Sequence, residues 1–568
     1  MNNRTARWIF AICLLVFGVC FLWPVLRIVA GGYIVDGTFT LRYLTGVFQN
    51  PVYAEGLRNS LMLAIGTTTL TILIGLPLAW LNTRYTFTGK RALSALLLLP
   101  MVLPPFVGAI GFQQMFGQYG AINALFRLGP VDWLGRGRYF GVILLQALAL
   151  YPILYLNAMA ALANIDPAME EAAANMGCAG FRRFRKITLP LMMPGLFAGG
   201  TIIFIAAFTE LGTPLIMNYN RCASVQVFDA LKEISASPFP YALVSVMLLC
   251  SVALYTLSKT IFGRHAAAMQ NKASTGAVAI KPAGFAACLI PMLFIGVIAI
   301  AILPHAGVVL TSFSAPGSWY RSILPEVFTS ANYIEALGHE MTLRSIRNSL
   351  LFSSLAVILN IGFGLAIALV VVRSSLKSRW LLDALSMIPL AVPGLVMAFG
   401  YLAISSTLSN HPRVAQSPTL LMLFDVRVNP TFFLVLAYAV RRLPYMVRST
   451  VAGLQQTSVS LEESAANLGA RPGTVLRKIT LPLITANIIA GTMLAFAFSM
   501  LEVSDSLMLA QRADYYPITK TIYELFQLIG SGTYIAAALG VWAMAFLAAT
   551  IIGCSLLLGR KMGAIFRI

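Results

Sequence analysis

The stretch EEAAANMGCAGFRRFRKITLP at residues 170–190 occurs again, as EESAANLGARPGTVLRKITLP, at residues 462–482. Both copies keep an acidic pair, small residues after it, one glycine and a final Ile-Thr-Leu-Pro at the same internal spacing. The copies lie 292 residues apart, and each is a polar island in a mostly apolar chain. A polar surface that occurs twice in such a chain indicates contact with something outside the apolar phase.

The composition is that of a membrane protein. The chain has 568 residues, of which 58% are hydrophobic and 11% are charged, whereas soluble domains carry about 25% charged residues. The net charge of +20 does not indicate a nucleic-acid partner, because the basic residues fall in short clusters between apolar runs. Such clusters are typical of cytoplasmic loops. The sequence therefore predicts a multi-pass protein of the lipid bilayer.

The cysteine pattern gives no chemistry. The seven cysteines are scattered, and no two of them have CxxC spacing. The sequence thus predicts no disulfide framework, no metal site and no cofactor within this chain. At the N-terminus, Arg4 and Arg7 precede an apolar run to Ala30, which is longer than a signal-peptide core. We interpret this run as an uncleaved first membrane helix.

The fold class predicted is all-α, with about 12 membrane-spanning helices, since a span needs about 20 mostly apolar residues. The segments are 8–30, 60–81, 93–115, 139–163, 187–211, 241–262, 283–303, 349–371, 381–404, 431–453, 479–509 and 536–558. Prolines interrupt some of them, which membrane helices tolerate when neighbours satisfy the freed carbonyls.

Charge predicts the topology. With the N-terminus in the cytoplasm and spans alternating, the larger share of the 40 Lys and Arg residues falls inside. The bias favours cytoplasmic N- and C-termini. It also predicts that both copies of the repeated stretch lie on the cytoplasmic side.

The repeat extends through the chain. Asn59-Ser60-Leu61 recurs as Asn348-Ser349-Leu350, and Gly75 recurs as Gly364, with an offset of 289. Each half holds six predicted spans, so the two six-helix repeats insert parallel to each other. We predict a first domain over 1–263, a cytoplasmic linker over 264–281 and a second domain over 282–568.

Local signals predict a short helix in each copy. Asp166 can cap the first helix, Pro167 fits its first turn, and Gly177 can end it in a left-handed conformation. In the second copy, Ser458 or Ser460 is the cap, and Ser460 has capping-box spacing to Glu463. A second short helix follows in each copy. An ordinary amphipathic interfacial helix would explain one copy, but not two with identical spacing.

The motif Glu-Ala-Ala, three residues, Gly, nine residues, Ile-x-Leu-Pro resembles the signature of permease subunits of binding-protein-dependent ABC importers. The resemblance covers nearly the whole chain, as two fused copies of the type I importer domain. It implies cytoplasmic coupling helices at about 167–186 and 459–478 that dock on an ATPase. The residues it implies for ATPase coupling are Glu170, Glu171, Ala172, Ala173, Gly177, Glu462, Glu463, Ser464, Ala465 and Gly469. The family prefers alanine where this chain has Ser464.

The chain lacks a phosphate-binding Gly-x-x-x-x-Gly-Lys-[Ser/Thr] loop. We therefore expect that it is not an enzyme, and that ATP and Mg are bound by a separate cytoplasmic ATPase, a homodimer meeting both motifs. The resemblance also implies a periplasmic or extracellular solute-binding protein. It places the chain in the bacterial inner membrane.

Charged residues inside spans tend to be functional. Glu210 lies near the outer end of the fifth span, Glu502 lies at the matching place 292 residues later, and Asp505 follows one turn on. These acids could line a gate or receive a cation. Alternatively, they are solvated at the interface or cap a helix end.

Arg441 and Arg442 interrupt the tenth predicted span, whereas their counterparts Ala149 and Leu150 are apolar. The arginines could face the pathway or hold an anion. Snorkelling toward the cytoplasm is the favoured interpretation, because they are assigned to that half of the helix.

The fused halves and the segment Phe-Thr-Glu-Leu-Gly-Thr-Pro at 208–214 are most similar to the permeases of the ferric-iron importer group. Related systems for 2-aminoethylphosphonate, polyamines, sulfate or thiamine are alternative assignments. A secondary transporter with duplicated halves is the alternative of another class. It would be expected to place coupling-ion groups at mid-membrane in both halves.

Overall fold

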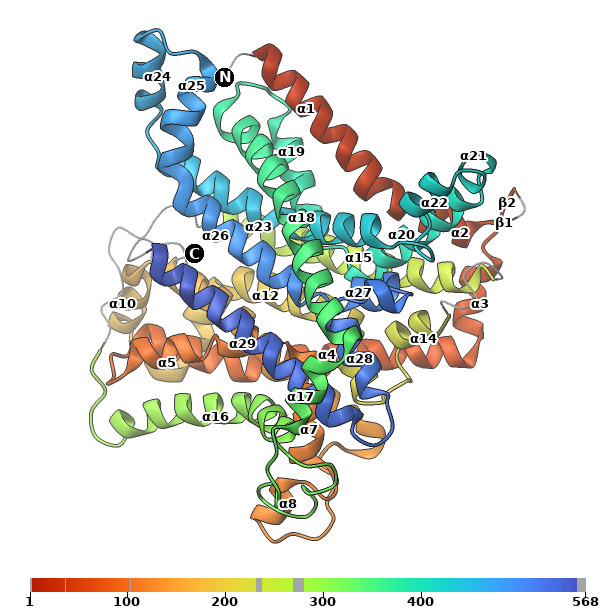
Figure 1. Ribbon diagram of the computed structural model, residues 1–568. Helices are drawn as coiled ribbons and strands as arrows, with labels where there is room; N and C mark the ends of the chain where they lie inside the picture. Colours follow the sequence, from red (N-terminus) through yellow and green to blue (C-terminus); the bar gives the residue numbers. More distant parts are fainter. Residues whose placement is uncertain (1–2, 36, 103, 231–236, 269–279, 559–568) are drawn as a thin grey trace.

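The computed structural model describes residues 3–35, 37–102, 104–230, 237–268 and 280–558. The protein is almost entirely helical (Figure 1), and the strands in the described part form one hairpin, β1 (Ile34–Val35) with β2 (Thr38–Phe39). Residues 269–279, the larger part of the predicted linker, lie outside the described residues. The bounds of the two domains and of the linker therefore stay predictions.

The first half runs from α1 to α15. Its helices are α1 (Asn3–Phe17), η1 (Gly18–Leu22), α2 (Trp23–Tyr33), α3 (Arg42–Gln49), α4 (Pro51–Arg84), α5 (Lys90–Leu96), α6 (Leu99–Val102), α7 (Pro105–Phe116), α8 (Ala121–Leu125), η2 (Arg136–Arg138), α9 (Tyr139–Ala163), α10 (Pro167–Asn175), α11 (Gly180–Arg183), η3 (Phe184–Thr188), α12 (Leu189–Thr209), α13 (Gly212–Ile216), α14 (Ala223–Asp229) and α15 (Phe239–Ala268).

The second half repeats this order. Its helices are α16 (Ala286–Ser312), α17 (Ala331–Gly338), α18 (Glu340–Arg373), α19 (Arg379–Met387), η5 (Ile388–Leu390), α20 (Gly394–Ser409), α21 (Pro412–Ala415), α22 (Pro418–Phe424), α23 (Thr431–Gln456), α24 (Val459–Asn467), α25 (Pro472–Val475), η6 (Leu476–Thr480), α26 (Leu481–Met500), α27 (Ser504–Leu509), η7 (Ala513–Tyr515), α28 (Ile518–Phe526) and α29 (Gly532–Leu558).

The membrane-spanning helices agree with the prediction in kind. Within the described residues, 9 helices are long and apolar enough to cross a membrane, and two bent pairs raise the number to 11. The predicted span that is missing from this set is the tenth, α23, which has 26 residues but contains several arginines. The arginines lower the mean hydropathy of α23, although the helix is long enough to cross a membrane.

Two predicted spans are broken. The predicted helix 381–404 is divided between α19 and α20, which meet at an angle of 98°. The equivalent span 93–115 is divided among α5, α6 and α7. Pro104 and Pro393 stand at the N-caps of α7 and α20, respectively, because proline has no N–H to continue the preceding helix. The repeated prolines thus mark repeated breaks.

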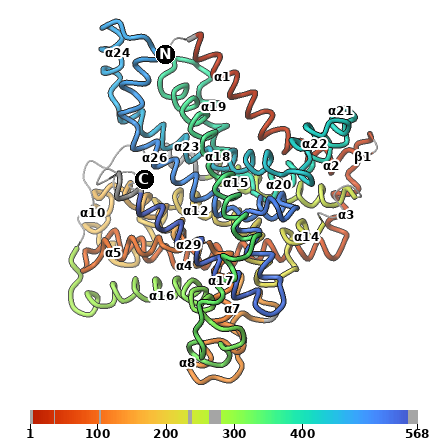
Figure 2. The backbone as a smooth tube through the Cα atoms, viewed as in Figure 1, coloured from red at the N-terminus to blue at the C-terminus, as the bar shows by residue number. Residues whose placement is uncertain are grey.

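The halves interlock through their first membrane helices (Figure 2). α16, from the second half, packs on α7 of the first, while α2 packs on α20 of the second. A Cβ on Gly111 would lie 2.1 Å from the backbone N of Val308 in α16, and one on Gly400 would lie 2.9 Å from the carbonyl O of Pro24 in α2. Each crossing therefore requires glycine.

The repeated Asn-Ser pair joins the outer segments to the long helices α4 and α18. Ser60 accepts a hydrogen bond from Ala223 N at 2.9 Å, and Ser349 accepts one from Ile518 N at 2.7 Å. Asn59 donates to the carbonyl O of Arg221 at 2.8 Å, as Asn348 donates to Asp514 O at 2.9 Å. The sequence repeat is thus a repeat of contacts.

The motif helices and the helix α8 lie at opposite ends of the molecule. Both ends of the described chain lie on the side that carries α10 and α24, whereas α8 projects at the far side (Figure 1). Along the chain, α10 follows α9 as α24 follows the equivalent helix α23. This arrangement fits two parallel repeats.

Candidate functional site

The first motif helix, α10, ends as its sequence predicts. Asp166 is the N-cap and accepts a hydrogen bond from Ala168 N at 3.0 Å, and Pro167 is the first helical residue. Gly177 has φ 78°, and the following amide, Cys178 N, donates to Ala173 O at 2.9 Å. This six-to-one bond with a left-handed glycine is the Schellman ending. The prediction that Asp166 caps the helix and that Gly177 ends it in a left-handed conformation is confirmed.

The second motif helix, α24, has the same ending. Gly469 has φ 83°, and Ala470 N donates to Ala465 O at 3.0 Å. Of the two predicted caps, Ser458 is the N-cap and accepts from Ser460 N at 3.3 Å. Ser460 lies inside the helix, so it is not the capping residue.

The motif helices expose apolar side chains beside their acids. Glu171, Ala172 and Gly177 are exposed on α10 and its C-terminal turn, and Ala173 is half-buried. Met176 is 86% exposed. A large apolar side chain fully exposed beside an alanine face is typical of a surface that a partner covers.

The second motif helix presents the same kind of surface. Glu463 and Ser464 are exposed, Ala465 is half-buried, and Gly469 is exposed. Leu468, the counterpart of Met176 at the 292-residue offset, is 89% exposed. Sequence reasoning named the acids and small residues but missed these two apolar side chains, although their shared position next to the glycine was visible.

The first acid of each pair faces inward, contrary to its expected place on the partner-facing surface. Glu170 is buried, pairs with Arg84 and accepts a hydrogen bond from Thr188 Oγ1 at 2.6 Å. Thr188 is the threonine of the repeated Ile-Thr-Leu-Pro. We call this group the first anchor, because it ties α10 to the end of α4 and to the start of α12.

The second anchor is equivalent. Arg373 Nε lies 3.1 Å from both carboxylate oxygens of Glu462, and Thr480 Oγ1 donates to Glu462 at 3.2 Å. Arg373 also donates to Thr457 O at 3.2 Å and to Thr457 Oγ1 at 3.1 Å. Arg84 and Arg373 are related by the 289-residue offset, so the repeat itself carried the signal for both anchors.

A π-helical turn joins each second short helix to the membrane helix that follows. η3 and η6 both end on the Arg-Lys-Ile-Thr sequence, and each leads without interruption into α12 or α26. The threonine of each anchor is therefore the last residue of the turn. π-turns inside helices frequently accompany functional sites.

The second half contains a buried cluster of four charged residues. Arg441 pairs with Glu502 and, at 3.1 Å, with Asp505, and Arg442 also pairs with Glu502. The side chains of Glu502 and Asp505 are 5% and 0% exposed. The snorkelling interpretation of the arginines is therefore wrong, because their guanidinium groups turn to the acids. The solvated alternative is also wrong for Glu502 and Asp505.

Glu210 has a different environment. Its carboxylate accepts from Thr213 N at 3.3 Å and from Thr213 Oγ1 at 3.4 Å, at the start of α13. This is the helix-capping alternative. With Ala149 and Leu150 in place of the two arginines, no ion pair joins Glu210 within the described residues.

The two acidic segments meet where the halves touch. A Cβ on Gly212 would lie 2.8 Å from Val503 Cγ1, so the turn after Glu210 packs directly against the turn after Glu502. Among the described residues, no group of three or more His, Cys, Asp or Glu side chains is placed to hold a metal ion. The structure thus brings the predicted acids together around the contact between halves.

Comparison with known proteins agrees with the repeat. The sequence model of a family described as binding-protein-dependent transport system inner membrane component matches residues 71–267 and 360–558. A putative ferric transport system permease protein of Haemophilus influenzae is 26% identical over 504 residues, covering 85% of this chain and 74% of that protein. A Fe(3+)-transport system permease protein of the same organism is 25% identical over 527 residues, covering 92% of this chain and 93% of that protein.

A shorter relative matches less of the chain. The sulfate transport system permease protein of Salmonella typhimurium is 30% identical over 231 residues, covering 39% of this chain and 81% of that protein. The two ferric transport relatives therefore extend over both halves, whereas this relative is about the length of one.

Proposed function

The chain belongs to the family of inner membrane components of binding-protein-dependent transport systems, and on this premise we propose that it is the permease of a ferric-iron importer. It is a multi-pass inner membrane protein, and the family is one of transport permeases and not of enzymes. Support for ferric iron as the cargo comes from the two-domain ferric transport relatives, which extend along most of this chain. Sulfate transport is the second candidate, supported by a relative that covers 39% of the chain.

We propose that a cytoplasmic ATPase homodimer docks on α10 and α24. Support comes from the two equivalent helices, each with a left-handed glycine and an exposed Met176 or Leu468 beside it. The residues proposed to touch the ATPase are Glu171, Ala172, Ala173, Glu463, Ser464 and Ala465. ATP and Mg would be bound by that partner, since the chain carries no phosphate-binding loop.

Glu170 and Glu462 are proposed to act indirectly. Because each is held in an anchor, it positions its motif helix and does not present a charge to the partner. Force on α10 or α24 would thereby reach α4 and α12, or α18 and α26, through one carboxylate. This link gives the motif helices a rigid connection to the membrane domain.

The orientation proposed is that of a bacterial inner membrane permease with both termini in the cytoplasm. The positive-inside bias supports it. A periplasmic or extracellular solute-binding protein would then meet the opposite side, where α8 projects (Figure 1). A secondary transporter is disfavoured, because the duplicated motif helices have no role in gradient-driven transport.

The pathway is proposed to pass the contact between the two acidic segments. Glu210, Glu502 and Asp505 would line it, with Arg441 and Arg442 holding two of these acids in the described conformation. Such charges are costly inside a membrane and are retained there for function. The acids suit a cation, and the arginines keep the resting cluster close to neutral.

Transport by reconstituted protein tests the proposal. The chain, its cognate ATPase and its binding protein are placed in proteoliposomes, and uptake of radioactive ferric iron and of sulfate is compared. We expect ATP-dependent iron uptake that requires all three proteins. Uptake driven by an ion gradient without the ATPase would refute the importer assignment, and ATP-dependent uptake of sulfate alone would refute the substrate.

Docking is tested separately by the exposed apolar pair. Met176→Asp together with Leu468→Asp should abolish association with the ATPase while leaving the fold intact, because both side chains are exposed. Ile529→Asp is the matched control, since Ile529 is equally exposed in the loop between α28 and α29. If the wild-type chain, the double variant and the control variant associate equally with the ATPase, the motif helices are not its docking site.

A further inference from the structure

A protrusion on the side opposite the motif helices is built from both halves. We define the outer protrusion as residues 117–138, between α7 and α9, and residues 313–330, between α16 and α17. The backbone N of Arg321 donates to the carbonyl O of Tyr119 at 3.1 Å, which joins the two segments. Trp319 packs with Met115 and Ala121 in a small apolar cluster beneath them.

The first segment is held rigidly by one buried asparagine. Asn123 Nδ2 donates to the carbonyl O of Gln118 at 2.9 Å and of Val131 at 2.7 Å, and its Oδ1 accepts from Trp133 Nε1 at 2.7 Å. A loop closed on itself by such bonds is ordered before any partner arrives. Preorganisation of this kind lowers the entropic cost of binding.

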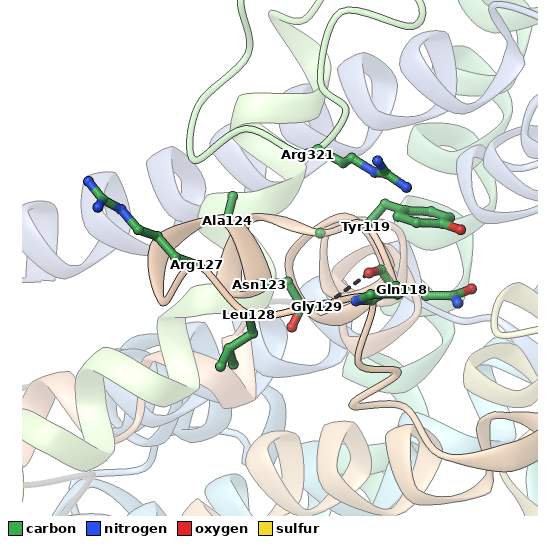
Figure 3. Close-up of a pocket in the computed structure, with 10 residues that line it drawn as sticks. Gln118, Tyr119, Asn123, Ala124, Arg127, Leu128, Gly129 and Arg321 are labelled. Carbon is green, nitrogen blue, oxygen red and sulfur yellow. Dashed lines mark hydrogen bonds between the residues drawn. The ribbon is translucent and has the colours of Figure 1, made fainter.

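A pocket of about 370 Å³ opens in the protrusion (Figure 3). Arg127 and Arg321 contribute to its lining from different segments, and Figure 3 shows Arg321 beside the ring of Tyr119, with Arg127 on the other side of α8. The Arg321 guanidinium lies 4.6 Å from the centre of the Tyr119 ring. The lining contains no acidic residue.

Both arginines adopt left-handed backbone conformations, with φ 51° at Arg127 and 55° at Arg321. Such conformations are uncommon for residues other than glycine, asparagine and aspartate, and they cluster at functional sites. The conformation of Arg127 is the Schellman ending of α8, because the backbone N of Leu128 donates to the carbonyl O of Asn123 at 2.9 Å, whereas Arg321 lies outside the helices. They hold the two guanidinium groups at the surface.

These arginines differ from others on the same side of the molecule in having no carboxylate partner. Arg427 pairs with Asp425 at 3.1 Å, Arg512 pairs with Asp514 at 3.0 Å, and Arg344 pairs with Asp514 as well. Within the part of the chain that the structure describes, neither Arg127 nor Arg321 makes an ion pair. The pocket therefore presents uncompensated positive charge.

Exposed aromatic and aliphatic side chains surround this charge. They are Phe126, Leu128, Trp133 and Tyr320, and all lie outside the membrane-spanning helices. Protein interfaces are enriched in aromatic residues and arginine and depleted in lysine and acids. Arginine, tyrosine and tryptophan also dominate the residues that contribute most to binding.

We propose that the pocket between Arg127 and Arg321 receives an acidic side chain of the solute-binding protein. This inference rests on the proposed function, and it names the contact through which that partner is recognised. Because the two guanidinium groups point to opposite sides of α8 in Figure 3, the carboxylate would pair with one of them, and the other would add to the attraction of the acidic surface around it. Because the pocket combines residues between 118 and 130 with Arg321, it forms only where the two halves are correctly joined.

An anionic lipid headgroup offers the same charge, but the observations favour the protein. The pocket is concave and is lined by polar groups such as Gln118 and Asn123 as well as the arginines. A flat headgroup surface would meet only the outermost of these groups. The two partners are distinguished by the test.

The experiment uses the permease with its ATPase in nanodiscs, and titrates purified ferric-loaded binding protein while ATP hydrolysis is measured. In the variant Arg127→Glu with Arg321→Glu, we expect the half-maximal concentration to rise by about tenfold or more, with an unchanged maximal rate. Arg413→Glu, at an exposed arginine on α21, is the control and should shift it less than about twofold. Basal hydrolysis confirms that each variant is folded.

The outcomes separate the inference from the proposed function. If the wild-type chain is stimulated and the double variant titrates identically, the pocket is not the docking site. If the shift appears only with anionic lipids and vanishes in neutral nanodiscs, the pocket binds lipid and the inference fails. If no concentration of binding protein stimulates even the wild-type chain, the proposed function itself fails. An Asp→Arg or Glu→Arg change on the binding protein that rescues the double variant identifies the partner carboxylate.

Discussion

Replacing Glu170 by glutamine should loosen the first motif helix without unfolding the protein. Glutamine keeps the shape of the side chain but removes the charge that pairs with Arg84. The Arg84 side chain is 20% exposed, so water can partly replace the lost partner. The change should leave helices far from α10 unaffected, because the anchor joins only α10, the end of α4 and the start of α12.

The size of the effect follows from the burial. Breaking a fully buried ion pair costs about 3–5 kcal/mol, and a hydrogen bond to a charged group contributes about 1.5–3 kcal/mol. Partial hydration of Arg84 lowers the first figure, whereas the bond from Thr188 can still be made to the amide oxygen. We therefore expect α10 to lose about 2–3 kcal/mol of local stability, which raises its opening equilibrium about 30- to 150-fold.

Hydrogen exchange measured by mass spectrometry reads this local opening. Peptides that cover 167–178 should exchange faster by the stated factor, while peptides from α29 should not change. Glu171→Gln is the matched control, since Glu171 is the exposed neighbour in the same helix and should alter stability by less than about 0.5 kcal/mol. Uptake per ATP hydrolysed should fall in Glu170→Gln, because the docked helix no longer moves with the membrane domain.

The repeat supplies a second comparison. Glu462→Gln should act on α24 in the same way, but Arg373 keeps its two hydrogen bonds to Thr457. The expected effect is therefore equal to or smaller than that of Glu170→Gln. Equal exchange rates for α10 in Glu170→Gln and Glu171→Gln would refute the anchor reasoning.

Three further changes test packing and charge. Arg441→Met leaves the buried Asp505 without its ion-pair partner and should lower the stability by about 3–5 kcal/mol, measured as a lower apparent melting temperature. Adding Asp505→Asn should restore most of the lost stability, and no recovery would contradict the pairing. Ser349→Ala leaves the amide of Ile518 without an acceptor and should speed exchange in α28 by an amount equal to about 1–3 kcal/mol; unchanged exchange there would contradict it. Gly111→Ala should reduce the yield of folded protein, because the added methyl meets the α16 backbone, and a normal yield and melting temperature would exclude that crossing.

The sequence was informative where the physical signal is local. The caps Asp166 and Ser458 and the left-handed Gly177 and Gly469 all follow from a few neighbouring residues. The repeat extended that reach, because one shared offset related features far apart in the chain. Local chemistry and repetition together were enough to locate the motif helices.

What the sequence could not supply depends on contacts between distant residues. Arg441 and Glu502 are 61 residues apart, and nothing near either one shows that they pair. The position of the arginines along the helix favoured snorkelling. A hydropathy scale counts every arginine as unfavourable in a membrane and takes no account of a neighbouring acid that pairs with it. The prolines indicated an interruption near the bend between α19 and α20, but not its angle of 98°, because an average over a window counts apolar residues on both sides of the bend.

Sequence patterns also do not show that the first helices of each half pack against the other half. Gly111 and Gly400 are each one glycine among many in apolar helices. Only the close approach of α16 to α7 and of α2 to α20 shows why a side chain is excluded there. The requirement belongs to the pair of helices and not to either sequence alone.

Fusion of the two halves explains why their charges can differ. In a symmetric dimer of identical halves, every residue at the axis occurs twice, so a carboxylate there faces its own copy under identical conditions. In this chain Glu502 is held by two arginines, whereas Glu210, at the matching position, only caps α13. Because like charges close together in a membrane repel strongly, neutralising one of the two permits both to stay near the axis. The two halves differ here, because Arg441 and Arg442 of the second half replace the apolar Ala149 and Leu150 of the first. This difference supports a pathway in which Glu210 is available to a cation while Glu502 is neutralised by its arginines.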